Sequence, residues 1–187
     1  MSVAPLPRAV LDSFRTEVKA ASWFAALGEP LTDGDRADAV AYAEALGLGR
    51  LAVDRVHDWP SAEWLLKTPG PSDWWDREDA LRKALLAEAE ARFPERALWT
   101  ALTELTTEAG DLVHGKAAAA AARMGSAAPA SIHVAAGAAA QAVHQLALAR
   151  LAGNESPPFE SKFHLFAAGR WPLGVVGSSP DFSNHHL

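Results

Sequence analysis

Histidine and glutamine side chains interrupt one strongly apolar stretch of the sequence, and they are the first candidates for chemistry. Residues 131–149 carry no formal charge, yet they include His133, Gln141 and His144. His133 and His144 are eleven residues apart, about three helical turns, so they point to nearly the same side of a helix. His114 precedes them and could join this polar stripe. The four side chains are candidates for a ligand-binding pocket between helices.

Three histidines with a carboxylate could bind a divalent metal ion, because imidazole is a common ligand of such ions. His133 and His144, however, are about 16 Å apart along a helix axis, too far to share one ion. The H-E-x-x-H and E-x-x-H motifs, which place ligands on adjacent turns, do not occur. We therefore expect these groups to hydrogen-bond between packed helices or at a subunit contact, and no metal or other cofactor is predicted.

A carboxylate, an imidazole and a hydroxyl also lie close together in the sequence at Asp54, His57, Asp58 and Ser61. A hydrolytic triad uses these groups, but the tertiary fold brings a triad together and sequence spacing does not. The G-x-S-x-G nucleophile motif and the phosphate-binding loop are both absent. Asp58 or Ser61 is better explained as a helix cap. The sequence favours a protein that is not an enzyme.

Tryptophans are concentrated in the least regular part of the chain, residues 49–75. Four of the seven tryptophans lie there. Near the C-terminus, Arg170 precedes Trp171, and this pair could stack or could bind a carboxylate. Tryptophan is common in protein interfaces and apolar ligand pockets, but it also fills gaps in a core. Core packing and an interface or pocket both remain open for Trp59, Trp64, Trp74, Trp75, Arg170 and Trp171.

The composition argues against a disordered, nucleic-acid-binding, secreted or membrane protein. With 187 residues, of which 49% are hydrophobic, the chain can form one ordinary domain and is not expected to be disordered. The net charge is -6 and the basic residues are scattered, which argues against nucleic-acid binding. The N-terminal sequence lacks the pattern of a secretory signal, so we expect a cytoplasmic protein. Most apolar residues of the stretch over 131–149 are alanines, and polar residues interrupt it, so no membrane contact is predicted.

The spacing of apolar residues predicts an all-α fold, a single-domain bundle of about seven to eight helices over residues 1–176. An extended C-terminal segment docks on the bundle, and residues 177–187 form a flexible tail. We expect helices over 8–27, 32–46, 75–93, 94–109, from 111 into the alanine run, 131–152, and a short one ending at Gly169. One or two helical turns are also expected over residues 61–67.

Several residues set the expected ends of these helices. Thr32 begins T-D-G-D, which resembles a capping box, and Gly110 is expected to break the chain between two helices. Ser131 is expected to cap the alanine-rich helix and Gly153 to end it. That helix should be the central one, because its small residues permit close approach by its neighbours. The glutamates at 78, 88 and 90 are expected on solvated helix faces.

Two stretches resemble known bacterial sequences. The segment KAAAAAARMGSAAPASIHVAAGAAAQAVHQLAL resembles the alanine- and histidine-rich helical pair of a bacterial family described as immunity proteins, in which a histidine is followed by valine, here His133 and Val134. The segment PFESKFHLFAAGRWPLG is similar to the ends of bacterial helical proteins without an assigned activity. The matching residues there are Phe159, Lys162, Phe166, Gly169, Trp171, Pro172 and Gly174. Neither resemblance supplies catalytic residues.

The sequence favours a non-enzymatic protein that acts by binding. We expect a homo-oligomer, with another protein as a further possible partner and an immunity-like role implied by the resemblance. The alternative is a metal- or small-molecule-binding protein, or an enzyme, with a pocket between helices lined by histidine and glutamine. A small-molecule sensor that uses the tryptophan-rich segment is the third hypothesis.

Overall fold

The fold is all helical, as the sequence predicts. The computed structural model describes residues 5–49, 51–67, 72–126, 128–154 and 159–174, and no strand occurs among them. The expected tail over 177–187 lies outside these residues. The described part of the chain forms seven helices: α1 (Arg8–Ala20), α2 (Asp33–Ala45), α3 (Trp59–Lys67), α4 (Ser72–Arg92), α5 (Glu95–Arg123), α6 (Pro129–Ala152) and α7 (Glu160–Ala167).

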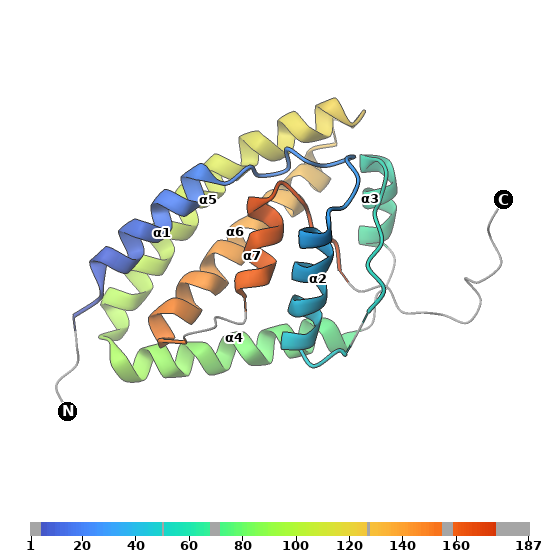
Figure 1. Ribbon diagram of the computed structural model, residues 1–187. Helices are drawn as coiled ribbons and strands as arrows, with labels where there is room; N and C mark the ends of the chain where they lie inside the picture. Colours follow the sequence, from blue (N-terminus) through green and yellow to red (C-terminus); the bar gives the residue numbers. More distant parts are fainter. Residues whose placement is uncertain (1–4, 50, 68–71, 127, 155–158, 175–187) are drawn as a thin grey trace.

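Helix α6 is the central helix of the bundle. It contacts α1, α4, α5 and α7, and it packs along α5 as an antiparallel pair (Figure 1). Its alanines allow this close packing, because Ala135, Ala139 and Ala142 are completely buried and add almost no width to the helix. The expectation of a central alanine-rich helix is confirmed.

Helix α5 is continuous where the sequence predicts a break. It runs for 29 residues through Gly110, and Asp111 does not start a new helix. A glycine inside a helix costs only about 1 kcal/mol relative to alanine. Residues on both sides of it, including Ala109 and Val113, are completely buried in the core. Packing on α6 therefore outweighs the local preference of Gly110.

Two other predicted helix ends are wrong. The first helix ends at Ala20 and not at residue 27, because the chain turns there and buries both Trp23 and Phe24. The indole of Trp23 donates to the carbonyl oxygen of Val18 at 2.8 Å, which holds this turn against the helix. Helix α6 begins at Pro129, so Ser131 is not its cap.

Other predicted ends are confirmed. Thr32 and Asp35 form the capping box of α2, and Asp58 caps α3 by accepting the backbone N–H of Ser61 at 2.7 Å. Gly153 ends α6 in the left-handed conformation with φ of 84°.

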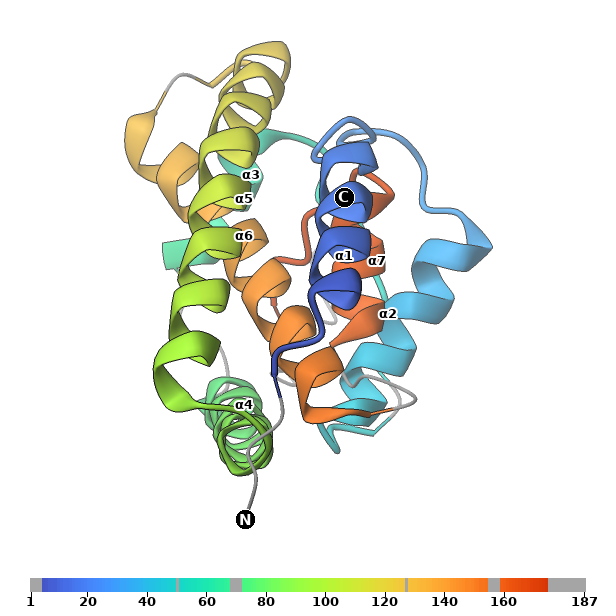
Figure 2. The ribbon, with the colours of Figure 1, turned by 90° about the vertical axis from the view of Figure 1, so that its left-hand side faces the viewer.

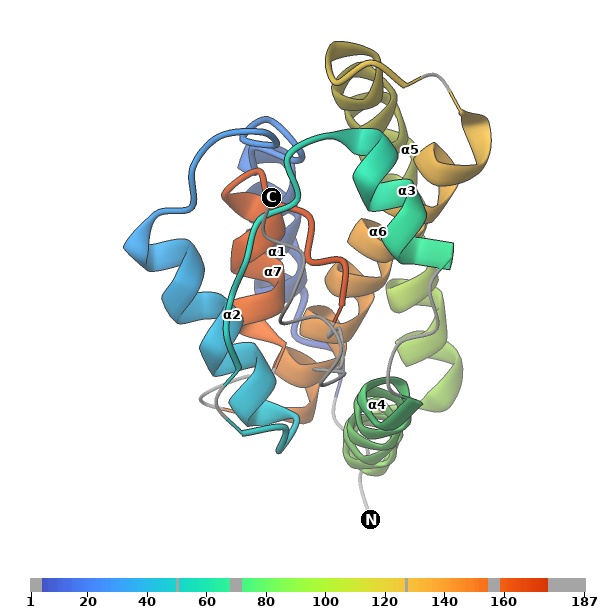
Figure 3. The same cartoon turned by 90° about the vertical axis from the view of Figure 1, so that its right-hand side faces the viewer.

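The other helices surround the α5–α6 pair. Helices α1 and α7 lie along α6, and α2 packs on the outer side of α7 (Figure 2). Helix α4 runs crosswise to them at one end of the bundle, where Figures 2 and 3 show it end-on. None of the helices that the structure describes combines the length and the hydropathy needed to cross a membrane.

Candidate functional site

A cavity of about 670 Å³ lies between α2, α3 and the segment that follows α7. Its wall is mostly apolar and includes Tyr42, Trp59, Trp74 and Trp171. The chain between α2 and α3 forms the outer side of the cavity, and Figure 3 shows this connection passing in front of the chain after α7. Residues 51–56 of the connection line the cavity, and we refer to them as the strap.

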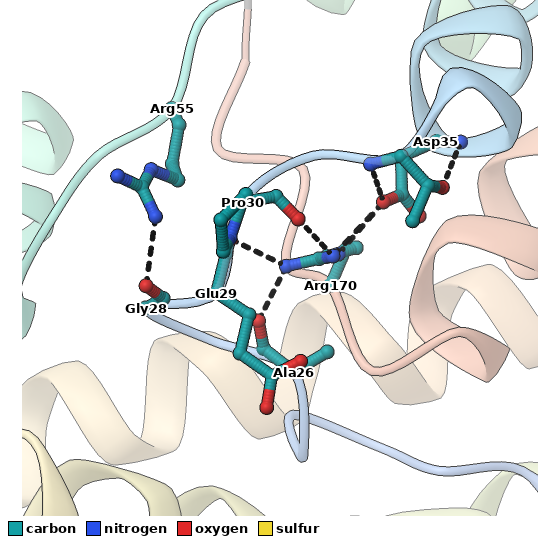
Figure 4. A network of polar contacts seen from close by, with 8 residues as sticks. Ala26, Gly28, Glu29, Pro30, Asp35, Arg55 and Arg170 are labelled. Carbon is teal, nitrogen blue, oxygen red and sulfur yellow. Dashed lines mark hydrogen bonds and ion pairs between the residues drawn. The ribbon is translucent and has the colours of Figure 1, made fainter.

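Few hydrogen bonds hold the strap. Arg36 of α2 donates to the carbonyl oxygen of Val53 at 2.9 Å. Arg55 reaches in the other direction and donates to the carbonyl oxygen of Gly28 at 2.8 Å (Figure 4). The strap has no helical hydrogen bonds of its own. Its side chains Leu51 and Val56 are half-buried, so an apolar face of the strap covers the cavity.

Arg170 fixes the opposite wall of the cavity. Its guanidinium donates to the carboxylate of Asp35 (3.1 Å from Nε) and to the carbonyl oxygens of Ala26, Glu29 and Pro30 (Figure 4). The bonds to Glu29 and Pro30 are 2.9 and 2.8 Å long. The sequence-based hypothesis that Arg170 binds a carboxylate is therefore matched by its contact with Asp35. Because all of these acceptors belong to the chain, Arg170 has a structural role.

The aromatic residues of the wall are themselves packed against one another. The rings of Trp59 and Trp171 are 5.1 Å apart, and Trp171 meets Phe24 edge-on at 6.3 Å. The Trp59 indole donates to the hydroxyl of Ser131 at 2.9 Å, which ties α3 to the start of α6. These residues are thus both core and cavity wall, so the two interpretations of the tryptophans are compatible for Trp59, Trp74 and Trp171.

Behind the cavity, the hydroxyl of Tyr42 belongs to a buried polar cluster. Its hydroxyl donates to the carboxylate of Glu78, which also accepts from Lys162 at 2.7 Å and from Gln145 at 2.5 Å. Lys162 completes the cluster by donating to the amide oxygen of Gln145 at 2.9 Å. Glu78 is only 2% exposed, so its expected place on a solvated helix face is wrong. The reason is that α4 crosses the bundle and turns this side chain toward α6 and α7.

The charges of this cluster are balanced. Burial disfavours ionisation of Glu78, but the ammonium of Lys162 and the three hydrogen bonds outweigh burial and lower the pKa of the carboxyl group. Burial lowers the pKa of Lys162, and the negative charge of Glu78 opposes this effect. Burial and the nearby Glu78 together raise the pKa of Tyr42. The cluster therefore consists of a buried ion pair held by two neutral groups.

The polar stripe of α6 lies away from this cavity. His133 and Gln141 are exposed, and none of the stripe residues lines the cavity wall. His144 is half-buried and lies 3.3 Å from the hydroxyl of Thr106; burial, followed by the charge of Arg82, lowers its pKa. The side chain of His114 lies beside that of His133, and their ring centres are 4.9 Å apart.

The metal-ligating side chains of the described residues are spread over the structure. Throughout the described residues, histidine, aspartate and glutamate side chains nowhere gather in threes in a way that could hold a metal ion. A three-histidine site that includes His144 is thus not formed by this arrangement.

The remaining tryptophan candidates lie on the surface. Trp64 and Trp75 are 57% and 55% exposed, although the ring of Trp75 is 4.4 Å from that of Trp74. Sequence reasoning identified Asp35 only as part of a capping box and missed its contact with Arg170, and it missed the ion pair of Glu78 with Lys162. Only the resemblance in the C-terminal segment pointed to Lys162, because pairing over 84 residues leaves no local pattern.

Comparison with known proteins gives no further guide to function. Searches against protein-family models, curated proteins and solved structures find no match.

Proposed function

We propose that this protein binds a small, mainly apolar molecule in the cavity under the strap. The observation that carries the proposal is the cavity itself, which combines a volume of about 670 Å³ with a wall of tryptophan, tyrosine and aliphatic side chains. Pockets for small molecules typically measure about 300–1,000 Å³ and have mostly apolar walls with a few polar groups. The weakly held strap offers a route of entry.

The charges around the cavity favour a neutral or cationic ligand. Asp35 and Arg170 line it but neutralise each other. The lining residues also include three acidic residues, Glu29, Asp54 and Asp58, against one further basic residue, Arg55. An excess of negative charge and the faces of several aromatic rings both favour a cation over an anion.

The proposal can be tested with three probes that differ in charge. Crystal violet is cationic, Nile red is neutral and anilinonaphthalene sulfonate is anionic, and each changes its fluorescence in an apolar site. We expect one molecule of crystal violet to bind per chain, with weaker binding of Nile red and the weakest of the sulfonate. Absence of saturable binding for all three probes would contradict the proposal.

A pair of variants on α2 locates the binding site. Ala39 lines the cavity, whereas Ala41, two residues away, is exposed and does not line it. Ala39→Phe should fill part of the cavity and weaken crystal violet binding at least tenfold. Ala41→Phe adds the same side chain outside the cavity and should leave the affinity unchanged. Equal affinities for the two variants would place the dye elsewhere.

Self-association or binding of another protein is the second candidate function. It is favoured by the exposure of Trp64 and Trp75, because large exposed aromatic side chains are typical of protein interfaces. An immunity-like role, implied by the resemblance of the alanine-rich segment, belongs to this candidate. Light scattering on the purified protein tests self-association: a dimer that Trp75→Ser converts to a monomer would support it, and a monomer at high concentration would contradict it.

A further inference from the structure

Two exposed histidines face each other across the α5–α6 pair, and neither lines the proposed ligand cavity. His114 belongs to α5 and His133 to the first turns of α6, and their ring centres are 4.9 Å apart. Both side chains are exposed. Among the described residues, neither imidazole has a hydrogen-bond partner that would occupy its nitrogens.

Each of the other described histidines lies beside a polar or charged side chain. His57 lies 3.0 Å from a guanidinium nitrogen of Arg55, and His144 lies 3.3 Å from the hydroxyl of Thr106. His164 lies 3.6 Å from the carboxylate of Asp38. In the described chain, only His114 and His133 have a second imidazole as their neighbour, so two nitrogen ligands of the same type are close together at this place alone.

The separation of the two rings matches that of two imidazoles on one metal ion. Zn–N bonds are about 2.0–2.1 Å long, and a ring centre lies about 1.1 Å beyond its nitrogen, so an N–Zn–N angle of about 90–110° places the centres about 4.5–5.1 Å apart. The observed 4.9 Å falls within this interval. The two helices therefore hold the ring centres at the separation that a shared ion requires.

We propose that His114 and His133 form a two-histidine site for a divalent transition-metal ion of the zinc or copper class. Imidazole suits these metals, whereas magnesium and calcium prefer oxygen ligands. Two protein ligands leave positions for water, which the exposure of both rings permits. A bound ion would link α5 to the start of α6 and stabilise this pair of helices.

The test is a calorimetric titration with Zn²⁺ alone, on full-length protein. His185 and His186 could bind zinc independently, so the parent protein for the titration carries His185→Ala and His186→Ala. We expect this parent to bind one Zn²⁺ per chain. Loss of a group that only orients a metal ligand costs about 10–100-fold in affinity, so loss of a ligand itself should cost at least that much.

Three further substitutions in the parent decide the result. His114→Ala and His133→Ala should each weaken zinc binding by that factor and should abolish the rise in Tm that zinc produces. His164→Ala removes an exposed histidine outside the pair and should change neither quantity. Because all three side chains are exposed, far-ultraviolet circular dichroism should show an unchanged fold. A parent that binds no zinc, or binding that survives either substitution in the pair, would overturn the proposal.

Discussion

Replacement of Lys162 by methionine tests the buried cluster most sharply. Methionine keeps much of the length and volume of the side chain but removes the ammonium that donates to Glu78 and Gln145. Glu78, 2% exposed, would retain only neutral donors. Breaking one partner of a buried ion pair typically costs about 3–5 kcal/mol. This is a large part of the 5–15 kcal/mol that stabilises a typical domain.

The native protein and the Lys162→Met variant should change their stability in opposite directions as the pH rises. In the native protein the folded-state pKa of Glu78 lies below its ordinary value, so the ion pair contributes stability above pH 4.5 and loses it as the pH falls through the folded-state value. In Lys162→Met, burial without a counter-charge should raise the folded-state pKa of Glu78 above its ordinary value. The variant should then lose stability as the pH rises toward neutrality. The difference between the two proteins should be largest at pH 7 and should shrink toward pH 4.

Urea unfolding at a series of pH values, followed by circular dichroism, measures these free energies. The double variant Glu78→Gln with Lys162→Met serves as the control, because it removes both charges. We expect the double variant to be less destabilised than the sum of the two single variants. Additive effects within about 0.5 kcal/mol would show that the two groups do not interact. A stability difference independent of pH would also refute the reasoning.

Other expected outcomes follow from the packing and from the wall of the cavity. Arg170→Met removes the charged partner of the buried Asp35 carboxylate, which keeps only the backbone N–H of Thr32, and it removes a donor to three carbonyl oxygens, so urea unfolding should show a loss of about 3 kcal/mol or more. The same Arg170→Met substitution should also weaken the binding of crystal violet. Ala139→Leu places a large side chain at a completely buried position of α6 and should cost about 1–3 kcal/mol in thermal unfolding, whereas Ala119→Leu at an exposed position of α5 should change stability by less than about 0.5 kcal/mol. Gly169→Ala should lower Tm, because φ is +86° there and a Cβ atom would lie 2.6 Å from the backbone nitrogen of Ala26; an unchanged Tm would contradict this account of the turn.

Local patterns predicted the helices well, but they did not predict how those helices meet. The capping box at Thr32 and the left-handed Gly153 depend on neighbouring residues only, and both are found. Gly110 and Ser131 carry local signals that tertiary packing overrides, since α5 continues on α6 and Ser131 serves instead as acceptor for a tryptophan. Such conflicts cannot be decided from propensity alone.

The candidate site also depends on contacts between distant segments, which local sequence patterns do not predict. The tryptophans were identified from the sequence because four of the seven lie in one short segment, and Arg170 because it precedes Trp171. The cavity that Trp59, Trp74 and Trp171 share depends on the path of three separate segments. The ion pair of Glu78 and Lys162 depends on the crosswise course of α4, and nothing near either residue in the sequence indicates it.

The most direct measurement of the central claim is a crystal structure of the protein with bound crystal violet. We expect one dye molecule beneath the strap, in contact with Tyr42 and with the wall that Arg170 fixes. Dye found on the exposed Trp64 or Trp75 with this cavity still empty would contradict the claim that the cavity is the binding site.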